Sequence, residues 1–456
     1  VAQAFLVAFT LPNMLRKIFA EGSFNKVFIP MFVEQKNNKR EASNFASIIF
    51  IILLVLLTII SALGIIFMPY LIKFLAFGFL SDNRFDMAVL YGRILFPYIL
   101  LISLTQLFNS ILNSLNLYHI STATQCILNL ALIGSLLLTS FYDGNFGMNL
   151  CISVIIAGII NLILVFRSCQ INGITINILN LDYNKSSLDK SKKFLTKFLP
   201  IGIASGVTQI NLVVGRQISS LFDGAVVWLI YADRLAQLPV AIIGVALNIV
   251  TLPKLTEFKI KREFDKINFY LNRSLQLSFL FSLPACIGLI VLDKEIVSAI
   301  FERGNFNLND TKNTSTALAI YSLSIIPISF QMLFLNYYFA EKEIRIPFFY
   351  SITSVILNIV IAYSFLNYFE YLSPAIAYSI TNFIVTFILV IQTIKRGFFF
   401  DRIFKKISIC IIFSSIFMIF ILLMTKYFIL DIIVLPYLSI LKLIILIFLG
   451  ISTYFV

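Results

Sequence analysis

The sequence has little charge. Only 12% of its 456 residues are Asp, Glu, Lys or Arg, whereas 59% are hydrophobic. Soluble domains carry roughly 25% charged residues, so this chain has too few charges to cover a surface that faces water. The composition excludes a soluble globular protein and predicts a polytopic membrane protein.

Histidine and paired cysteines are scarce as well. His119 is the single histidine, and the cysteines at 126, 151, 169, 286 and 410 show no C-x-x-C spacing, so neither a His-based metal site nor a disulfide framework is supported. No Walker motif G-x-x-x-x-G-K-[ST] occurs. The spans also hold no nucleophile–base constellation. We expect no enzyme and no cofactor; coupling to a monovalent cation stays open, with no site identified.

Long apolar runs are abundant. A helical span needs about 20 apolar residues, and none of the runs alternates like a barrel strand. The sequence therefore predicts an all-α protein with thirteen spans, near 4–33, 46–72, 88–113, 121–141, 146–166, 198–219, 225–252, 274–292, 315–339, 346–366, 373–393, 407–425 and 436–456.

The basic residues between these spans give the orientation. When alternate loops are assigned to the cytoplasm, starting with 34–45, they hold 22 Lys and Arg residues against 6 in the opposite loops. This bias fits the positive-inside rule. The first span then runs from outside to inside, so we expect one preceding helix to be missing and the intact protein to have fourteen spans. A genuinely outside N-terminus is the alternative.

Weak internal repeats indicate a duplicated architecture. Pro97 recurs as Pro327 after 230 residues, and Asn129 within CILNLALI recurs as Asn358 within VILNIVIA after 229. Two-lobed transporters are often built from such repeats. We expect two pseudo-symmetric six-helix lobes around a central cavity, with these limits: 1–166 for the N-lobe without its first helix, 167–197 for a cytoplasmic linker, 198–396 for the C-lobe and 397–456 for two C-terminal helices.

Seven basic residues lie inside or at the ends of spans: Arg16, Lys17, Lys26, Arg93, Arg216, Arg234 and Lys442. A charge at the bilayer centre costs roughly 2.5–3.5 kcal/mol. Side chains near a helix end escape this cost by snorkelling to the interface, which accounts for Lys26 and Lys442. The roles of Arg93 and Arg216 stay open between snorkelling and cavity lining.

Two groups of charges lie too deep in their spans for this explanation. Arg16 and Lys17 are adjacent in mid-span, with Glu21 one helical turn after Lys17. Asp233 and Arg234 are neighbours within YADRLAQLP. An Asp beside an Arg can be a self-neutralising structural pair. The excess of positive charge instead favours a water-filled cavity for an anion, and a diphosphate is the natural candidate because Arg binds phosphate oxygens bidentately.

The stretch LPNMLRKIFAEGSFNKVFIPMF resembles the signature of the MurJ (MviN) family of lipid II flippases, in the multidrug/oligosaccharidyl-lipid/polysaccharide exporter superfamily. ILFPYILLISL at 94–104, YADRL at 231–235 and GVAL at 244–247 strengthen the resemblance, which runs to about residue 400 and continues more loosely to the end. It implies fourteen helices in two lobes plus a final pair that forms a groove for a polyprenyl tail.

The resemblance also implies a function. The chain is expected to move lipid II, the undecaprenyl-diphosphate-linked disaccharide-pentapeptide of peptidoglycan, from the inner to the outer leaflet of the bacterial cytoplasmic membrane by alternating access. Matched by motif, the cavity residues are Arg16, Glu21 and Arg234, with Asn129 as a further candidate. Lys17 replaces a frequent arginine, and Gln3 stands where an Asp is often found, which puts an acidic role there in doubt.

Three functions remain distinguishable at this point. The expected partners of a flippase are lipid II, membrane lipids and cell-wall synthesis proteins, with no nucleic acid. A cation-coupled drug exporter of the same superfamily predicts a mainly acidic cavity, whereas the charges here are mainly basic. A non-transporting cell-wall scaffold predicts that loss of Arg16 or Arg234 leaves growth unchanged.

Overall fold

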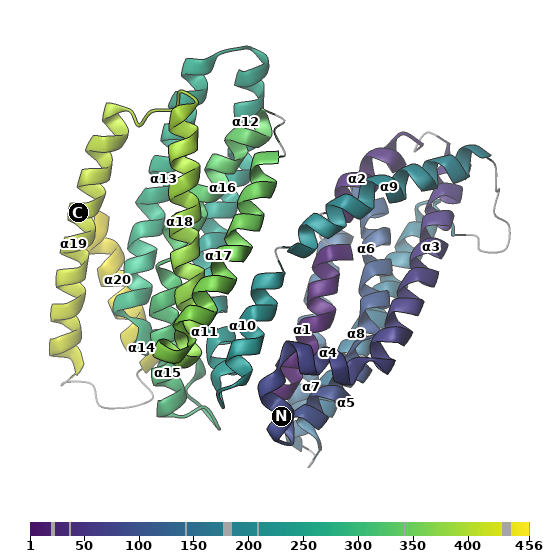
Figure 1. The fold of residues 1–456 in the computed structure, drawn as a ribbon, viewed down its shortest axis with the longest axis horizontal. Helices are drawn as coiled ribbons and strands as arrows, with labels where there is room; N and C mark the ends of the chain where they lie inside the picture. The colour runs from purple at the N-terminus through teal and green to yellow at the C-terminus, as the bar shows by residue number, and fades with distance from the viewer. Residues whose placement is uncertain are drawn as a thin grey trace. The chain divides into compact units, whose positions relative to one another are not determined.

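The chain forms two compact helical units, Val1–Leu221 and Phe222–Val456. A computed structural model describes residues 1–19, 23–35, 38–141, 144–176, 185–207, 209–341, 343, 345–430 and 439–455, and these ranges contain helices and no strand (Figure 1). The predicted all-α fold is confirmed. The boundary between the units lies later than residue 198, where we expected the second lobe to begin. The subdivision into lobes, linker and final helices stays a prediction.

Unit 1 contains ten α-helices and one short 3-10 helix among its described residues. They are α1 (Ala2–Phe19), α2 (Ser23–Val33), α3 (Lys39–Ile66), α4 (Met68–Leu75), η1 (Phe77–Ser81), α5 (Arg84–Leu95), α6 (Tyr98–Ser114), α7 (Tyr118–Phe141), α8 (Phe146–Ile171), α9 (Lys185–Val207) and α10 (Ile210–Ser220).

Helix α6 organises unit 1, since it packs against α1, α2, α3, α7 and α8. Its buried face carries large apolar side chains such as Leu107 and Phe108 together with small polar ones such as Ser110. Small residues at helix interfaces let backbones approach closely inside a membrane. Ser110 uses this closeness to donate a hydrogen bond to Oδ1 of Asn25 on α2.

An aromatic cluster joins α9 to the rest of unit 1. Phe194 and Phe198 stack on each other with ring centroids 5.6 Å apart, and both rings meet Phe24 on α2 edge-on, at 5.5 and 5.9 Å. Such pairs add about 0.5–1.5 kcal/mol beyond the area that they bury. The C-terminal part of the expected linker 167–197 is therefore a docked helix, and the charges of α9, such as Lys192 and Lys193, stay exposed.

Unit 2 is larger in helix length. Its elements are α11 (Ala225–Pro239), a π-helical turn η2 (Val240–Val245), α12 (Ala246–Ile260), α13 (Phe264–Val291), α14 (Asp293–Phe301), α15 (Leu308–Ser322), α16 (Ile325–Ala340), α17 (Arg345–Phe369), η3 (Glu370–Leu372), α18 (Ser373–Lys395), α19 (Arg402–Leu430) and α20 (Ser439–Phe455).

Two clusters of buried side chains hold unit 2 together. One includes Leu229, Leu318 and Leu446, so it connects α11 and α15 to the last helix α20. The other includes Leu271, Phe334 and Leu389 and connects α13, α16 and α18. The α12–α13 turn and the short helix α14 lie at opposite ends of unit 2 (Figure 1).

The prolines of the proposed repeat occupy similar positions in the two units. Pro97 separates α5 from α6, and Pro327 lies in the first turn of α16, just after the break at 323–324 between α15 and α16. Pro is tolerated where a helix starts because the first N–H groups have no intrahelical partner. Asn129 and Asn358 differ, since Asn129 is exposed and Asn358 is buried.

Nine helical segments in the described part of the chain are long and apolar enough to cross a membrane, and Ile440–Phe455 is a shorter apolar helix. One of the nine, Arg345–Lys395, contains both predicted spans 346–366 and 373–393. The predicted spans 4–33 and 198–219 are interrupted by residues outside the described ranges. A multi-pass membrane protein is confirmed, and the count of thirteen spans stays a prediction.

Candidate functional site

The predicted site residues belong to both units, and each unit is described by itself. In unit 1, Arg16 lies on α1 four residues after Pro12, and its side chain is half-buried. Pro12 leaves a backbone carbonyl of the first turns without its N–H partner. Lys17 continues the same helix, but its side chain and all of Glu21 lie outside the described residues. Their predicted roles stay predictions.

Tyr98 is a neighbour of Arg16 that the sequence did not single out. It lies at the start of α6, its side chain is 1% exposed, and it is within electrostatic range of Arg16. In the described part of the chain the Tyr98 hydroxyl has no hydrogen-bond partner. The ring packs near Phe9 on α1, with centroids 6.4 Å apart. A guanidinium and a hydroxyl donor therefore share one buried region of unit 1.

Arg216 and Thr10 form a polar contact between α10 and α1. Nε of Arg216 on α10 donates to Oγ1 of Thr10 over 3.3 Å, and both side chains are at least half-buried. The Arg216 side chain is therefore directed toward α1, and the choice between snorkelling and cavity lining stays open. Arg93, by contrast, is exposed at the end of α5.

Gln3 also has a defined contact in unit 1. Its Oε1 accepts a hydrogen bond from Nη1 of Arg84 (3.1 Å), and Arg84 forms an ion pair with Asp82 at 2.6 Å. Gln3 therefore contacts a cation but brings no charge. Asn129 is exposed on α7, and its predicted role in the cavity stays a prediction.

In unit 2, Asp233 and Arg234 lie on α11 and point in different directions because adjacent helix residues are about 100° apart. Asp233 is half-buried, and its Oδ2 accepts a hydrogen bond from Nε2 of Gln237 one turn later (2.7 Å). Arg234 is exposed and forms no ion pair within the described residues. The structure therefore does not support a self-neutralising Asp233–Arg234 pair.

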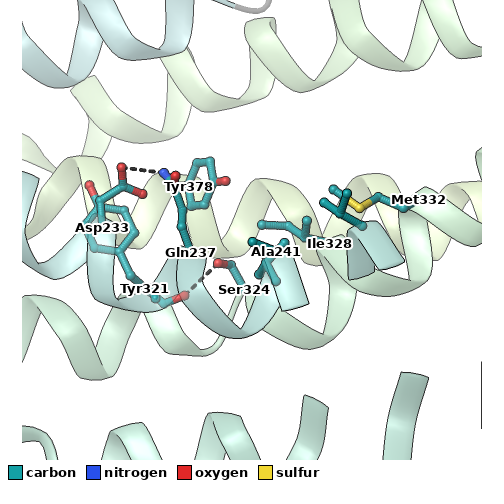
Figure 2. Close-up of a pocket in the computed structure, with 11 residues that line it drawn as sticks. Asp233, Gln237, Ala241, Tyr321, Ser324, Ile328, Met332 and Tyr378 are labelled. Atoms are coloured by element: carbon teal, nitrogen blue, oxygen red, sulfur yellow. Dashed lines mark hydrogen bonds between the residues drawn. The ribbon is translucent and has the colours of Figure 1, made fainter. Parts of the chain in front are cut away.

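A cavity of about 280 Å³ opens beside Asp233. Asp233 and Gln237 lie at one end of it and Met332 at the other, with Tyr321 and Tyr378 close to the carboxylate (Figure 2). The remaining lining residues include Ser324, Ile328 and Ala241.

The π-helical turn η2 forms part of the cavity wall. It follows Pro239 directly and includes the lining residues Val240, Ala241 and Val245. π-helical turns are rare inside α-helices and are frequent at functional sites. Within the described residues no group of three His, Cys, Asp or Glu side chains could hold a metal ion.

A family model and relatives of known sequence that match this chain carry the same name. A family model described as "Lipid II flippase MurJ" matches residues 1–448. The "Probable lipid II flippase MurJ" of Rickettsia prowazekii (strain Madrid E) is 33% identical over 355 residues, which cover 77% of this chain and 69% of that protein. The protein of the same name from Buchnera aphidicola subsp. Acyrthosiphon pisum is 33% identical over 390 residues, covering 84% and 75%.

Solved structures of related transporters are also similar to this chain. A structure titled "Lipid II flippase MurJ, inward closed conformation" matches with a TM-score of 0.82 and 25% identity, covering 99% of this chain and 90% of that one. An inward-facing multidrug resistance MATE family transporter of the MOP superfamily matches with a TM-score of 0.74 and 15% identity, covering 86% and 90%. The second likeness concerns the fold alone.

Proposed function

Because this chain belongs to the MurJ family of lipid II flippases, we propose that Arg16 and Arg234 bind the diphosphate of the lipid that it moves. The chain is a multi-pass protein of the bacterial cytoplasmic membrane, and its function is to move the peptidoglycan precursor lipid II from the inner to the outer leaflet. The half-buried position of Arg16 on an apolar helix is the observation that carries the proposal.

The position of Arg16 within an apolar span has an energetic cost. Holding a guanidinium in an apolar span costs roughly 2.5–3.5 kcal/mol. A phosphate offsets this cost because charge-assisted hydrogen bonds are about twice as strong as neutral ones, and the planar guanidinium can donate two of them at once. In the proposal, Tyr98 adds a hydroxyl donor near Arg16, and Lys17 adds a second positive charge on α1.

Asp233 and Gln237 have a different role in the proposal. The exposed Arg234 contributes positive charge from unit 2, while the Gln237 amide holds the Asp233 carboxylate along α11. Asp233 then limits how tightly the diphosphate is bound, so that the lipid can leave. Glu21 is proposed to do the same on the side of Arg16, and Asn129 to contact the sugar or peptide part.

The proposed cycle makes and breaks no covalent bond. Binding of the headgroup in the inward-open state neutralises the cavity arginines, and the two lobes then close on the inner side and open on the outer side. The energy comes from an ion gradient, including a monovalent cation gradient, from the membrane potential or from consumption of the product. Membrane lipids and cell-wall synthesis proteins are the other partners in this proposal.

Leaflet accessibility of labelled lipid II tests the proposal in cells depleted of their own flippase. Arg16→Ala and Arg234→Ala should each lower outward movement about tenfold or more, since each removes a charged hydrogen-bond donor. Arg16→Lys should retain part of the activity, because the charge stays and the fork is lost. Arg93→Ala is the matched control, an exposed span-end arginine that should leave transport unchanged.

Membrane insertion of every variant is verified by its amount in the purified membrane fraction. Wild-type rates in inserted Arg16→Ala and Arg234→Ala would overturn the arginine mechanism and leave family membership untouched. Growth supported by both variants without lipid II movement would instead favour a scaffold.

A further inference from the structure

A second polar cavity in unit 2 lies apart from Asp233 and Arg234. It has a volume of about 420 Å³ and is formed by α14, α15 and the beginning of α20. Three lysines line it, one from each helix: Lys294 on α14, Lys312 on α15 and Lys442 on α20. The sequence offered only snorkelling as an account of Lys442, and no role for the other two.

The charges around this cavity do not cancel. Two carboxylates also line it, but Glu295 forms an ion pair with Lys426 (3.1 Å) and Glu302 accepts a hydrogen bond from Oγ1 of Thr311 (2.9 Å). In the described part of the chain, the ammonium groups of Lys294, Lys312 and Lys442 form no ion pair. Of the charged groups that line the cavity, three lysines and one carboxylate, Glu302, have no ion-pair partner among the described residues. The net charge of the cavity is therefore positive.

The position of Lys442 sets the depth of the cavity in the membrane. Lys442 lies in the first turn of α20 and is half-buried, while the apolar residues around it on the helix surface, such as Leu441 and Ile444, are exposed. An apolar helix with exposed apolar side chains faces lipid, so its terminal lysine reaches the level of the headgroups. The charge count predicts that the segment 293–314, and so this end of unit 2, lies outside the cytoplasm.

The positions of the helices that form the cavity are consistent with its placement outside the cytoplasm. α14 packs against both α15 and α20. It lies at the end of unit 2 opposite the α12–α13 turn, which carries the basic residues of a cytoplasmic loop (Figure 1). Basic pockets between transmembrane helices bind lipid headgroups on the cytoplasmic side of membranes, and the same chemistry is available here on the outer side.

We propose that this cavity binds the phosphate of a lipid in the outer leaflet. Three lysines from three helices line one space, and an ammonium interacts with phosphate as a point charge without demanding a fixed geometry. A volume of about 420 Å³ holds a phosphate or diphosphate with part of its attached group. The binding requires no transport, so it goes beyond the proposed function.

Native mass spectrometry of the full chain in phosphatidylcholine nanodiscs tests the proposal. Phosphatidylglycerol, undecaprenyl diphosphate and soluble inorganic pyrophosphate are titrated separately. We expect at least one of the two lipids to bind. The triple variant Lys294→Gln, Lys312→Gln, Lys442→Gln should weaken that binding about tenfold or more, since each lysine near a membrane surface contributes about 1 kcal/mol.

Two further variants separate a specific site from general membrane charge. Lys395→Gln, Lys405→Gln and Lys406→Gln together remove the same charge from exposed positions of unit 2 outside this cavity, and should leave lipid binding unchanged. Glu302→Gln removes a negative charge from the cavity wall and should tighten binding. A gain of affinity is not an outcome that loss of folding can produce.

The arms of the titration also identify the source of the phosphate. Binding of undecaprenyl diphosphate alone assigns the site to the translocated lipid, and binding of phosphatidylglycerol assigns it to bulk anionic lipid; either result supports the proposal. Equal binding by wild type and the lysine triple variant, an equal loss in the control triple variant, or pyrophosphate bound as tightly as lipid would overturn it. Arg16→Ala should leave lipid binding at this cavity intact. A failure of the present proposal can therefore be told apart from a failure of the proposed function.

Discussion

Nε of Arg216 on α10 donates a hydrogen bond to Oγ1 of Thr10 on α1, although 206 positions separate the two residues in the sequence. The same hydroxyl donates a hydrogen bond to the carbonyl of Leu6 (2.7 Å). The Thr10 hydroxyl is therefore a donor within α1 and an acceptor for the neighbouring helix α10. Arg216 is thus held against α1 inside unit 1. Arg216, whose role the sequence left open, therefore forms a hydrogen bond between two helices of unit 1.

Thr10→Val should weaken unit 1 slightly. The substitution keeps the shape of the side chain and removes the acceptor for Arg216, and hydrogen bonds between membrane helices average about 0.6 kcal/mol with a maximum near 1.7. We expect the free energy of unfolding, measured by denaturant titration in detergent, to fall by about 0.5–1.5 kcal/mol. Thr105→Val is the control, because the buried Thr105 hydroxyl donates to Leu101 within its own helix. Equal losses in both variants would contradict the role of the interhelical bond.

Glu341→Gln should destabilise unit 2 more than Glu343→Gln does. The Glu341 carboxylate is 15% exposed and bridges two cations, Lys259 on α12 (2.5 Å) and Arg396 after α18 (3.0 Å). Among the residues that the structure describes, Glu343 pairs with Arg396 alone, and it is 40% exposed. Exposed pairs contribute about 0–1 kcal/mol, whereas breaking a more buried one costs more. We expect a loss of about 1–2 kcal/mol for Glu341→Gln and less than about 0.5 for Glu343→Gln, measured by thermal unfolding in detergent.

Much of the fold could be predicted because its cause is local. Apolar runs such as 146–166 and 407–425 are long enough to span a bilayer, and they lie within the helices α8 and α19. Not every break within a span was predicted. The division of the predicted span 315–339 at 323–324, between α15 and α16, lies just before Pro327. The carbonyl of Pro327 accepts a hydrogen bond from Oγ1 of Thr386 on α18, and a hydropathy pattern does not report such a contact.

The candidate site, too, could be predicted from the sequence only in part. Arg16 and Arg234 are visible in the sequence because charges within apolar runs are rare. Tyr98 and Thr10 are not visible, since tyrosine and threonine are ordinary in such helices and their contacts join residues distant in sequence. Gln237 could have been found: it follows Asp233 by four residues, which places both on one face of a helix.

Asp82→Asn should reduce the acid sensitivity of unit 1. The Asp82 carboxylate accepts a hydrogen bond from Nε of Arg84 (2.7 Å), and this bond lowers the pKa of Asp82 below its usual value of 3.8. A carboxyl group with a lowered pKa stabilises the folded state above its unfolded pKa and loses this contribution as the pH falls through the folded value. Wild type should therefore lose more thermal stability than Asp82→Asn between pH 5 and about pH 3. Parallel curves for the two proteins would contradict the expectation.

Tyr98→Phe should separate stability from substrate binding. The Tyr98 hydroxyl is buried near Arg16 and has no hydrogen-bond partner in the described part of unit 1. An unsatisfied buried hydroxyl costs about 1–3 kcal/mol, so its removal should leave the free energy of unfolding unchanged or raise it by up to about 1 kcal/mol. If the hydroxyl donates to the diphosphate, affinity for lipid II should fall about tenfold, because a hydrogen bond to a charged group contributes roughly 1.5 kcal/mol.

Tyr91→Phe is the matched control for this prediction. The Tyr91 ring is also 1% exposed in unit 1, but its hydroxyl donates to Oδ1 of Asn145 over 3.2 Å. Its removal should lower the free energy of unfolding by about 1 kcal/mol and leave lipid II affinity unchanged. The two tyrosines are therefore expected to give opposite patterns in the same two measurements, unfolding in detergent and lipid II titration in nanodiscs. Wild-type affinity in Tyr98→Phe would remove Tyr98 from the binding site and leave Arg16 as its tested residue in unit 1.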